Sequence, residues 1–373
     1  MNSFLVICPT APGRLDGVAD YACWLTAHLS AHAPAYLVGL SDDDAAAAAG
    51  APSMPDVRRV TVSSWRELWA KRREAPFSHG AALLQYVPQL YLRSFGFAWL
   101  VLWLASLRVR GRPIAVTVHE YAVPASGSFR RAGARLAMMF VILVIGSLAT
   151  NIVVTFELTR RRLGRLLFWK TRRIAVVPVG SNIPAPTSTL PYQGDTVTCT
   201  IFGQPAAMHA PLVCAVGAWL TRAGGRVRVR WIGRSKSAIQ AFLREHCGQP
   251  AETFEIVAGR APEEVSALLA ASDLCLAPIV DGVSSRRTTV VAALAHGLPI
   301  IGTDGICTDD VFRGTDACRL VPPGDSQGFV RDLETLVADA ERRRQGSRAA
   351  RALFDGHFTW DLIARAYVAH LNG

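Results

Sequence analysis

The residues best suited to chemistry form a run of hydroxyl and guanidinium side chains just before an apolar helical pattern. The run consists of Ser284, Ser285, Arg286, Arg287, Thr288 and Thr289. Serine and threonine are typical of helix N-termini, where backbone N–H groups and the helix dipole attract anions. Arginine adds a planar fork of donors that fits phosphate oxygens. The order predicts a phosphate-binding helix start; the alternative is a capped helix with two solvated arginines.

Further candidates follow predicted strands. Gly203 and Arg234 end two strands of the second half, and His119 and Glu120 end one in the first half. Ligands of doubly wound proteins bind at the carboxyl ends of the strands, where an arginine can hold a phosphate. A histidine there can hydrogen-bond a sugar or tune a proton transfer, although a supporting or helix-capping role is the alternative for His119 and Glu120. Near the N-terminus, the turn from Gly13 to Gly17 precedes a helix and lets a ligand approach the backbone.

The elements that position these residues alternate between short apolar runs and helical patterns, which indicates βαβ units and parallel sheets. Strands are predicted in the first half at residues 4–8, 36–40, 57–62, 82–85, 114–119, 152–155 and 174–177. In the second half they are predicted at residues 196–202, 227–232, 253–257, 274–277, 300–303 and 318–321. The proline-rich segment 181–195 reads as a stiff connection. We therefore predict an α/β protein with two doubly wound, Rossmann-like domains and ligands in the cleft between them.

Length and composition agree with that architecture. The 373 residues are comfortable for two domains, and half of them are apolar. The 8 cysteines are scattered without a CxxC pair, so we expect buried thiols in a reducing compartment rather than disulfides or a metal site. No secretory signal is apparent at the start of the sequence. No cluster of His, Asp or Glu with metal-ligand spacing is present either, so we expect neither metal nor cofactor.

The excess positive charge lies in the first half. Residues 1–190 hold 21 basic and 10 acidic side chains, whereas residues 191–373 hold 19 of each. Such a skew suits an anionic surface, and without a nucleic-acid-binding motif we favour lipid headgroups over nucleic acid. The tryptophan-containing segments 63–77 and 94–107 fit either membrane contact or a packed core. The charge-free stretch Leu136–Phe156 is long enough to span a bilayer, but its polar interruptions favour a helix followed by a strand.

Several motifs together resemble a known family. They are GRLDGVADY, QYVPQLY, VPVGSNIP and the block from EIVAGRAPEEV to AHGLPIIGT. The chain resembles the GT-B glycosyltransferases, most closely the retaining family-4-type (group 1) enzymes. The resemblance implies an acceptor domain at 1–185, a linker at 186–195, a nucleotide-sugar donor domain at 196–355, and a helix at 356–373 that crosses back to the first domain.

The resemblance also assigns roles to the candidate residues. It implies that Gly17, His119 and Asp281 serve the reacting end, and that Gly259 and Arg260 frame the base. The implied acceptor side consists of Gly13, Asp16, Asp20 and Glu120. It further implies that the donor diphosphate is bound by Gly203, by Arg234 and by the six residues Ser284, Ser285, Arg286, Arg287, Thr288 and Thr289. The family's two glutamates fall on Ser284 and Ala292, and its phosphate-binding lysine has no obvious counterpart in GQPAAMHAP.

The activity implied is transfer of a hexosyl group from a nucleoside diphosphate sugar to an acceptor hydroxyl, with retention and without metal. The acceptor expected is a lipid-linked glycan or another hydroxyl compound in glycolipid or polysaccharide assembly. The location expected is the cytoplasm, peripheral on the inner face of the membrane. Two alternatives stay open. The missing glutamates fit a noncatalytic scaffold or regulatory partner, and a nucleotide-sugar epimerase would use the same phosphate grip but more carboxylates.

Overall fold

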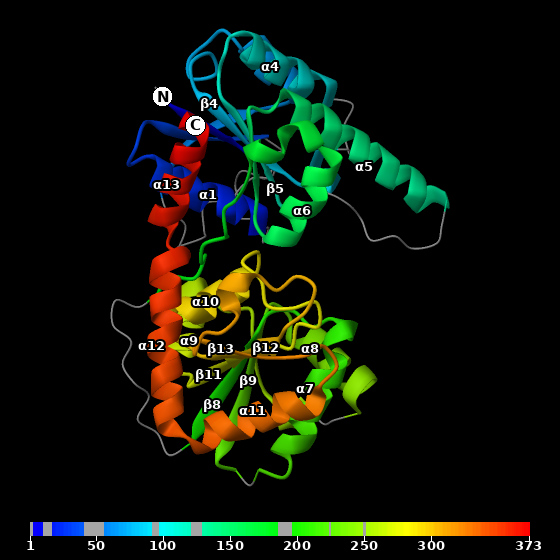
Figure 1. The fold of residues 1–373 in the computed structure, drawn as a ribbon, viewed down its shortest axis with the longest axis vertical. Coiled ribbons are helices and arrows are strands. Elements are labelled where there is room, and N and C mark those ends of the chain that lie inside the picture. The colour runs from blue at the N-terminus through cyan, green and yellow to red at the C-terminus, as the bar shows by residue number, and fades with distance from the viewer. Residues whose placement is uncertain are drawn as a thin grey trace. The chain divides into compact units, whose positions relative to one another are not determined.

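The computed structural model describes residues 3–9, 17–40, 56–91, 97–120, 129–185, 196–223, 225–248 and 251–373. The chain divides into two compact units (Figure 1). Unit 1 comprises Met1–Pro178 and Trp360–Gly373, and unit 2 comprises Val179–Thr359. Unit 2 is therefore inserted in the sequence between two parts of unit 1. The expected linker, 186–195, lies outside the described residues.

The sheet of unit 1 has parallel strands in the order β3-β2-β1-β4-β5-β6-β7. The strands are β1 (Phe4–Ile7), β2 (Ala35–Leu40), β3 (Arg58–Val62), β4 (Ala81–Tyr86), β5 (Ile114–Val118), β6 (Asn151–Val154) and β7 (Ile174–Val176). In the central strand β1, Val6 pairs with Leu37 on one side and Leu83 on the other, and the whole strand is buried. A strand hidden on both faces is apolar throughout, which explains why these runs are recognisable in the sequence.

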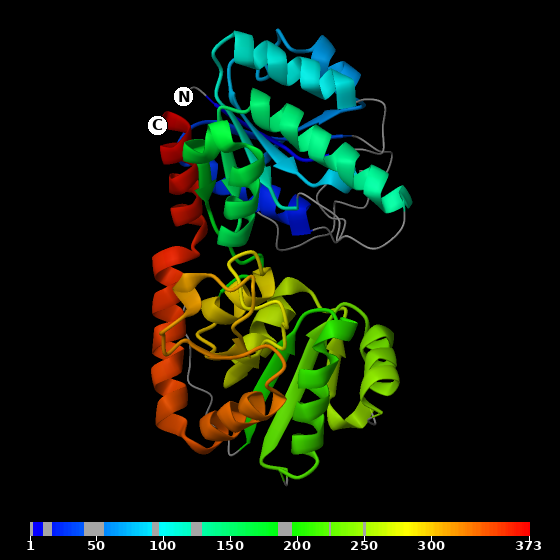
Figure 2. The ribbon, with the colours of Figure 1, turned by 45° about the vertical axis from the view of Figure 1, so that its right-hand side comes forward.

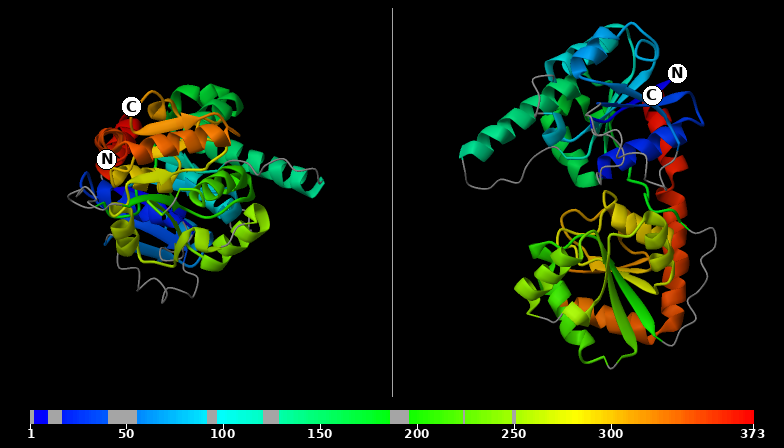
Figure 3. Two further views of the ribbon diagram at one scale, coloured as in Figure 1. Left: turned by 90° about the horizontal axis from the view of Figure 1, so that it is seen from below. Right: turned by 180° about the vertical axis from the view of Figure 1, so that it is seen from behind.

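Helices cover both faces of this sheet. They are α1 (Gly17–Leu29), α2 (Trp65–Ala70), α3 (Pro88–Tyr91), α4 (Phe97–Val109), α5 (Phe129–Leu148), α6 (Glu157–Leu166), the 3-10 helix η2 (Phe168–Arg173) and α13 (Trp360–Asn372). Successive residues of a strand point to opposite faces. Val116 of β5 accordingly shares a core with Trp103 of α4, while the Thr117 Oγ1 atom lies 2.7 Å from the Tyr367 hydroxyl of α13. Helix α13 runs beside α1 (Figures 1 and 3), so the last helix completes unit 1.

The tryptophans of α2 and α4 lie in the core of unit 1 or pack against it. Trp65 and Leu68 of α2 are buried together with Trp103 of α4. Trp69 is partly buried, with the Arg72 guanidinium 4.2 Å from the centre of its ring. The burial of these side chains agrees with a packed core. Segment 136–156 forms the end of α5 and then β6, as predicted, and no described helix is long and apolar enough to cross a membrane.

Unit 2 has parallel strands in the order β10-β9-β8-β11-β12-β13. The strands are β8 (Val197–Phe202), β9 (Val227–Gly233), β10 (Glu255–Ala258), β11 (Leu274–Leu276), β12 (Ile300–Thr303) and β13 (Cys318–Val321). The α-helices are α7 (Ala210–Leu220), α8 (Lys236–Phe242), α9 (Pro262–Ala270), α10 (Thr288–Ala295), α11 (Ser326–Ala338) and α12 (Ala340–His357). The short helices are η3 (Ala207–His209), η4 (Leu243–Cys247), η5 (Ala251–Thr253) and η6 (Asp310–Phe312).

Two helical layers enclose the sheet of unit 2. Trp231 of β9 shares a core with Val213 of α7 and Phe329 of α11. The helices α7 and α11 lie side by side (Figure 2). On the opposite face, the Arg230 guanidinium donates a 3.2 Å hydrogen bond to the Leu268 carbonyl of α9. The predicted class, two doubly wound parallel-sheet domains, is confirmed.

The expectation for the cysteines is wrong at one pair. Cys214 of α7 and Cys247 of η4 are joined by a disulfide, with their Cα atoms 5.0 Å apart. The packing of η4 against α7 brings together two residues that are 33 positions apart in the sequence, a spacing that gives no local signal. The other six cysteines are buried thiols, as expected.

Candidate functional site

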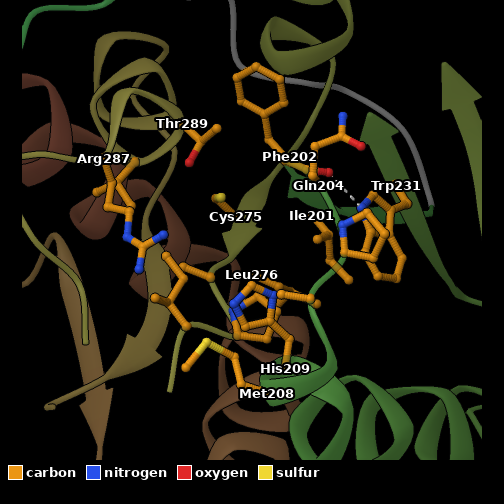
Figure 4. A pocket seen from close by; sticks show the side chains of 17 residues that line it. Ile201, Phe202, Gln204, Met208, His209, Trp231, Cys275, Leu276, Arg287 and Thr289 are labelled. Atoms are coloured by element: carbon orange, nitrogen blue, oxygen red, sulfur yellow. Dashed lines mark hydrogen bonds between the residues drawn. The ribbon is translucent and has the colours of Figure 1, made fainter. Parts of the chain in front are cut away.

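A pocket opens at the carboxyl ends of β8 and β11 in unit 2 (Figure 4). Its volume is about 310 Å³. The lining consists of Ile201–Ala206, Met208, His209, Trp231, Cys275–Ile279, Arg287, Thr289 and Val290. The Trp231 indole donates a 3.0 Å hydrogen bond to the Gly203 carbonyl, which fixes the loop after β8. An apolar pocket with a few polar groups at strand ends is the usual form of a small-molecule site in α/β proteins.

Helix α10 presents its N-terminus to this pocket. Arg287 is the N-cap residue, with an extended backbone, and it makes no side-chain capping hydrogen bond. Residues 290–295 are all buried, so the apolar pattern in the sequence fixes the helix against the body of unit 2. Thr289, in the first turn, lines the pocket. The positive end of the helix dipole therefore faces the pocket, where it favours anions.

The two arginines of the predicted phosphate site are held by one carboxylate. The Arg286 Nη2 atom lies 2.7 Å from Asp281 Oδ2, and the Arg287 Nη2 atom lies 2.6 Å from Asp281 Oδ1. Burial lowers the pKa of Arg287, and the neighbouring Arg286 lowers it further, while Asp281 opposes both effects. The cluster carries two positive charges and one negative charge. The one excess positive charge attracts a further anion.

The serines of the motif act differently from one another. The Ser285 amide and hydroxyl donate hydrogen bonds of 2.8 and 2.6 Å to Asp309 Oδ2, which ties the loop before α10 to the segment after β12. Ser284 is fully buried, and its hydroxyl has no hydrogen-bond partner within the described residues. Ala292, at the second glutamate position, is also buried. No carboxylate thus replaces the family's glutamates at these two positions.

His209 is a pocket residue that the sequence analysis did not select. It ends η3, immediately before α7, and faces the same space as Arg287 (Figure 4). Burial lowers its pKa below the usual 6.5, and the charge of Arg287 lowers it further, whereas Asp281 raises it. The resembled family carries a phosphate-binding lysine in this segment. A search for any cationic side chain would have included this histidine.

The other predicted donor residues lie around the neighbouring strand ends. Arg234 is exposed after β9, and Gly259 and Arg260 are exposed after β10. The Gly259 amide donates a 3.2 Å hydrogen bond to the Gly233 carbonyl, and its φ of +66° is one that glycine adopts without strain. Arg260 pairs with Glu264 at 3.2 Å. These residues do not line the pocket, whereas Gly203, Arg287 and Thr289 do.

The first-half candidates lie in unit 1. His119 follows β5 and is half-buried; its Nε2 atom is 2.9 Å from Gln85 Oε1, and its ring meets that of Tyr21 edge to face at 4.9 Å. These contacts fix the orientation of the imidazole. Glu120 is exposed, and Asp20 is half-buried in α1. Gly17 begins α1 with no atom within 4 Å of where a Cβ would lie. Gly13 and Asp16 lie outside the described residues.

A metal site was not expected from the sequence. Among the residues that the structure describes, no group of three or more His, Cys, Asp or Glu side chains is arranged to hold a metal ion.

Comparisons with known proteins agree with this arrangement. Residues 207–339 match the model of the family "Glycosyl transferases group 1". No curated protein sequence matches the chain. Among solved structures, HepE of Anabaena in complex with UDP and glucose is 13% identical over all of both chains, with a TM-score of 0.70. Sucrose-phosphate synthase of Thermosynechococcus elongatus is 15% identical, covers 99% of this chain and 98% of its own, and has a TM-score of 0.68.

A third solved structure resembles the whole chain as well. It is a TarM variant from Staphylococcus aureus in complex with fondaparinux, alpha-GlcNAc-glycerol and UDP, 8% identical over all of both chains with a TM-score of 0.69. At these identities, the structures show a shared fold. The fold is GT-B. Within this fold, residues 207–339 are similar to the group 1 glycosyltransferases.

Proposed function

We propose that the chain transfers a hexose from a UDP-sugar to an acceptor hydroxyl, with retention of configuration and without a metal ion. The observation that carries the proposal is the cluster at the start of α10, where Arg286 and Arg287 share Asp281 beside a pocket of about 310 Å³. UDP is chosen as the nucleotide because the HepE and TarM structures of the same fold contain it.

The site suits the charge that develops in the reaction. Breaking the bond between the anomeric carbon and the phosphate oxygen leaves both bonding electrons on UDP. The arginines and the dipole of α10 stabilise that charge without reorganisation, which is the role that a metal plays in other enzymes. The acceptor oxygen then bonds to the anomeric carbon on the same face, and its proton passes to a phosphate oxygen of UDP. For the reacting end, the candidate residue of unit 1 is His119, whose imidazole is oriented by Gln85.

The acceptor side of the proposal concerns unit 1. Its excess of basic side chains fits an acceptor carried on an anionic membrane, such as a lipid-linked glycan in glycolipid or polysaccharide assembly. We place the reaction at the cytoplasmic face of the membrane, where nucleotide sugars are the available donors.

Calorimetric titration with UDP tests the donor site. Arg286→Ala and Arg287→Ala should each weaken UDP binding by roughly tenfold to a hundredfold, because a charge-assisted hydrogen bond contributes about 1.5–3 kcal/mol. Arg348→Ala, on the exposed side of α12 in the same unit, is the matched control and should bind UDP normally. Unchanged affinity in both pocket variants would disprove the assignment. Release of UDP from UDP-glucose when a hydroxyl acceptor is added distinguishes an enzyme from a noncatalytic partner.

A further inference from the structure

Two aromatic side chains are exposed on unit 1 at the short helix η2. Phe168 is 74% exposed and Trp169 is 51% exposed, and their rings meet at right angles with centroids 5.0 Å apart. Large aromatic side chains are usually withdrawn from water, so an adjacent exposed pair marks a contact surface.

The backbone that carries this pair is held firmly. Leu167, directly before η2, is fully buried in the core of unit 1, and Ile174, directly after it, begins β7. The Lys170 Nζ atom donates hydrogen bonds to the carbonyl oxygens of Ser147 in α5, at 2.9 Å, and of Ala149, directly after α5. The two rings are therefore presented by a fixed turn, anchored on both sides.

The surroundings are strongly basic. Residues 157–173 contain seven basic side chains and a single acidic one, Glu157. Glu157 pairs with Arg160 at 2.7 Å and with Arg161 at 3.0 Å. Within the described part of the chain, no ion pair is formed by the exposed residues Arg162, Arg165, Arg172 and Arg173. Burial lowers the pKa of Lys170, and the positive charge of Arg108, at the end of α4, lowers it further. The positive charge around η2 therefore extends to the end of α4.

We propose that unit 1 docks on an anionic lipid membrane through the α6–η2 surface. This surface consists of Arg162, Arg165, Phe168, Trp169, Arg172 and Arg173. Aromatic rings bury their apolar area at the level of the lipid headgroups while arginines meet the anionic phosphates, so the two residue types together match an interface. The proposal deepens the proposed function, because it rests on the membrane association proposed there and names the surface that would make the contact.

A single-stranded nucleic acid is the rival occupant, since it too binds aromatic and basic side chains. Nucleobases need open ring faces for stacking. In the edge-to-face pair, one ring edge covers a face of the other ring, which reduces the stacking area. Insertion of ring edges into a lipid interface has no such requirement.

Flotation of the full chain with lipid vesicles tests the assignment. The protein should float with phosphatidylcholine vesicles that contain phosphatidylglycerol and should stay behind with phosphatidylcholine alone. The charge variant Arg165→Gln/Arg172→Gln should lose roughly twenty-fivefold in partitioning, because each basic residue near an anionic surface contributes about fivefold. The aromatic variant Phe168→Ser/Trp169→Ser should lose at least as much.

Matched controls separate this surface from general effects. Phe140→Ser removes another aromatic side chain of unit 1, 65% exposed on α5, and Arg222→Gln/Arg226→Gln removes two exposed arginines of unit 2. Both should float like the parent protein. Equal loss in the controls, no loss in the α6–η2 variants, or no flotation of the parent would overturn the proposal. Binding to single-stranded RNA that is tighter than binding to the vesicles, and that depends on the α6–η2 surface, would also overturn the proposal.

UDP calorimetry on the same variants keeps this proposal distinct from the proposed function. The α6–η2 variants should bind UDP as the parent does and should melt at the same temperature. Flotation that depends on the α6–η2 surface, in a protein that does not bind UDP, would support the membrane surface and refute the donor assignment. UDP binding without patch-dependent flotation would give the reverse result.

Discussion

Binding of a nucleotide sugar to unit 2 should be accompanied by uptake of a proton at His209. The imidazole lines the pocket together with Arg287. Burial and the charge of Arg287 hold its pKa below 6.5, and the carboxylate of Asp281 offsets them only in part. Without donor, His209 is therefore neutral at pH 7. A bound diphosphate places negative charge beside the imidazole and favours its protonated form.

The sign and size of the effect follow from linkage. The donor complex binds more protons than the free protein, so affinity is highest below the pKa of the free protein and falls as the pH rises through the pKa of the complex. Each unit of pKa difference contributes about 1.4 kcal/mol, or about tenfold in affinity. Unit charges about 5 Å apart interact by about 3 kcal/mol at an effective dielectric constant of about 20. Allowing for screening, we expect affinity to fall by roughly tenfold to a hundredfold between about pH 5 and pH 8.

Calorimetry with UDP-glucose measures this linkage. UDP-glucose is preferred to UDP because a terminal phosphate itself titrates near a pH of about 6. Titrations in two buffers with different heats of ionisation give the number of protons taken up. His209→Gln should remove the pH dependence, while His357→Gln, an exposed histidine of α12, should retain it. An affinity independent of pH in the parent, or a pH dependence that survives in His209→Gln, would refute the reasoning.

Two further substitutions probe the supports of the fold and site. Gly305→Ala places a methyl group against the backbone of Asp281, so it should shift the arginine cluster and weaken UDP binding by tenfold or more. Gly356→Ala, with open space around the added methyl group, is the control for the calorimetry. Equal UDP affinities of the two variants would contradict the expectation. Tyr367→Phe removes a hydroxyl that contacts Tyr21 and Thr117, and urea unfolding should show a loss of about 1–3 kcal/mol in stability. An unchanged urea midpoint would show that this buried network contributes nothing.

The strands were predictable because their signal is local. All the predicted strands are present within one or two residues, since β-branched, doubly buried segments such as Ile300–Thr303 leave a continuous apolar run. The start of α10 was predictable for a similar reason: its hydroxyl residues and arginines are adjacent in the sequence. The pairing of Arg286 and Arg287 with Asp281 was not predicted, because it depends on how the loop folds back.

The features that escaped prediction depend on contacts between distant residues. Asp309 supports Ser285 across 24 positions, and Cys214 meets Cys247 across 33. The tryptophans illustrate a different limit. Trp65 and Trp69 have helical spacing beside basic residues, a pattern that a core-facing helix and a membrane-facing helix share. Only the packing of α2 against α4 decides between the two interpretations.

The return of α13 to unit 1 sets an order for folding during synthesis. Trp360, Ile363 and Tyr367 belong to the interior of unit 1, but the ribosome makes them only after the whole of Val179–Thr359. At about 5–20 residues per second, unit 1 waits roughly ten seconds or more for its last helix. Unit 2, which is continuous in sequence, can therefore reach its native state first. Until α13 arrives, the face of α1 that receives it stays uncovered.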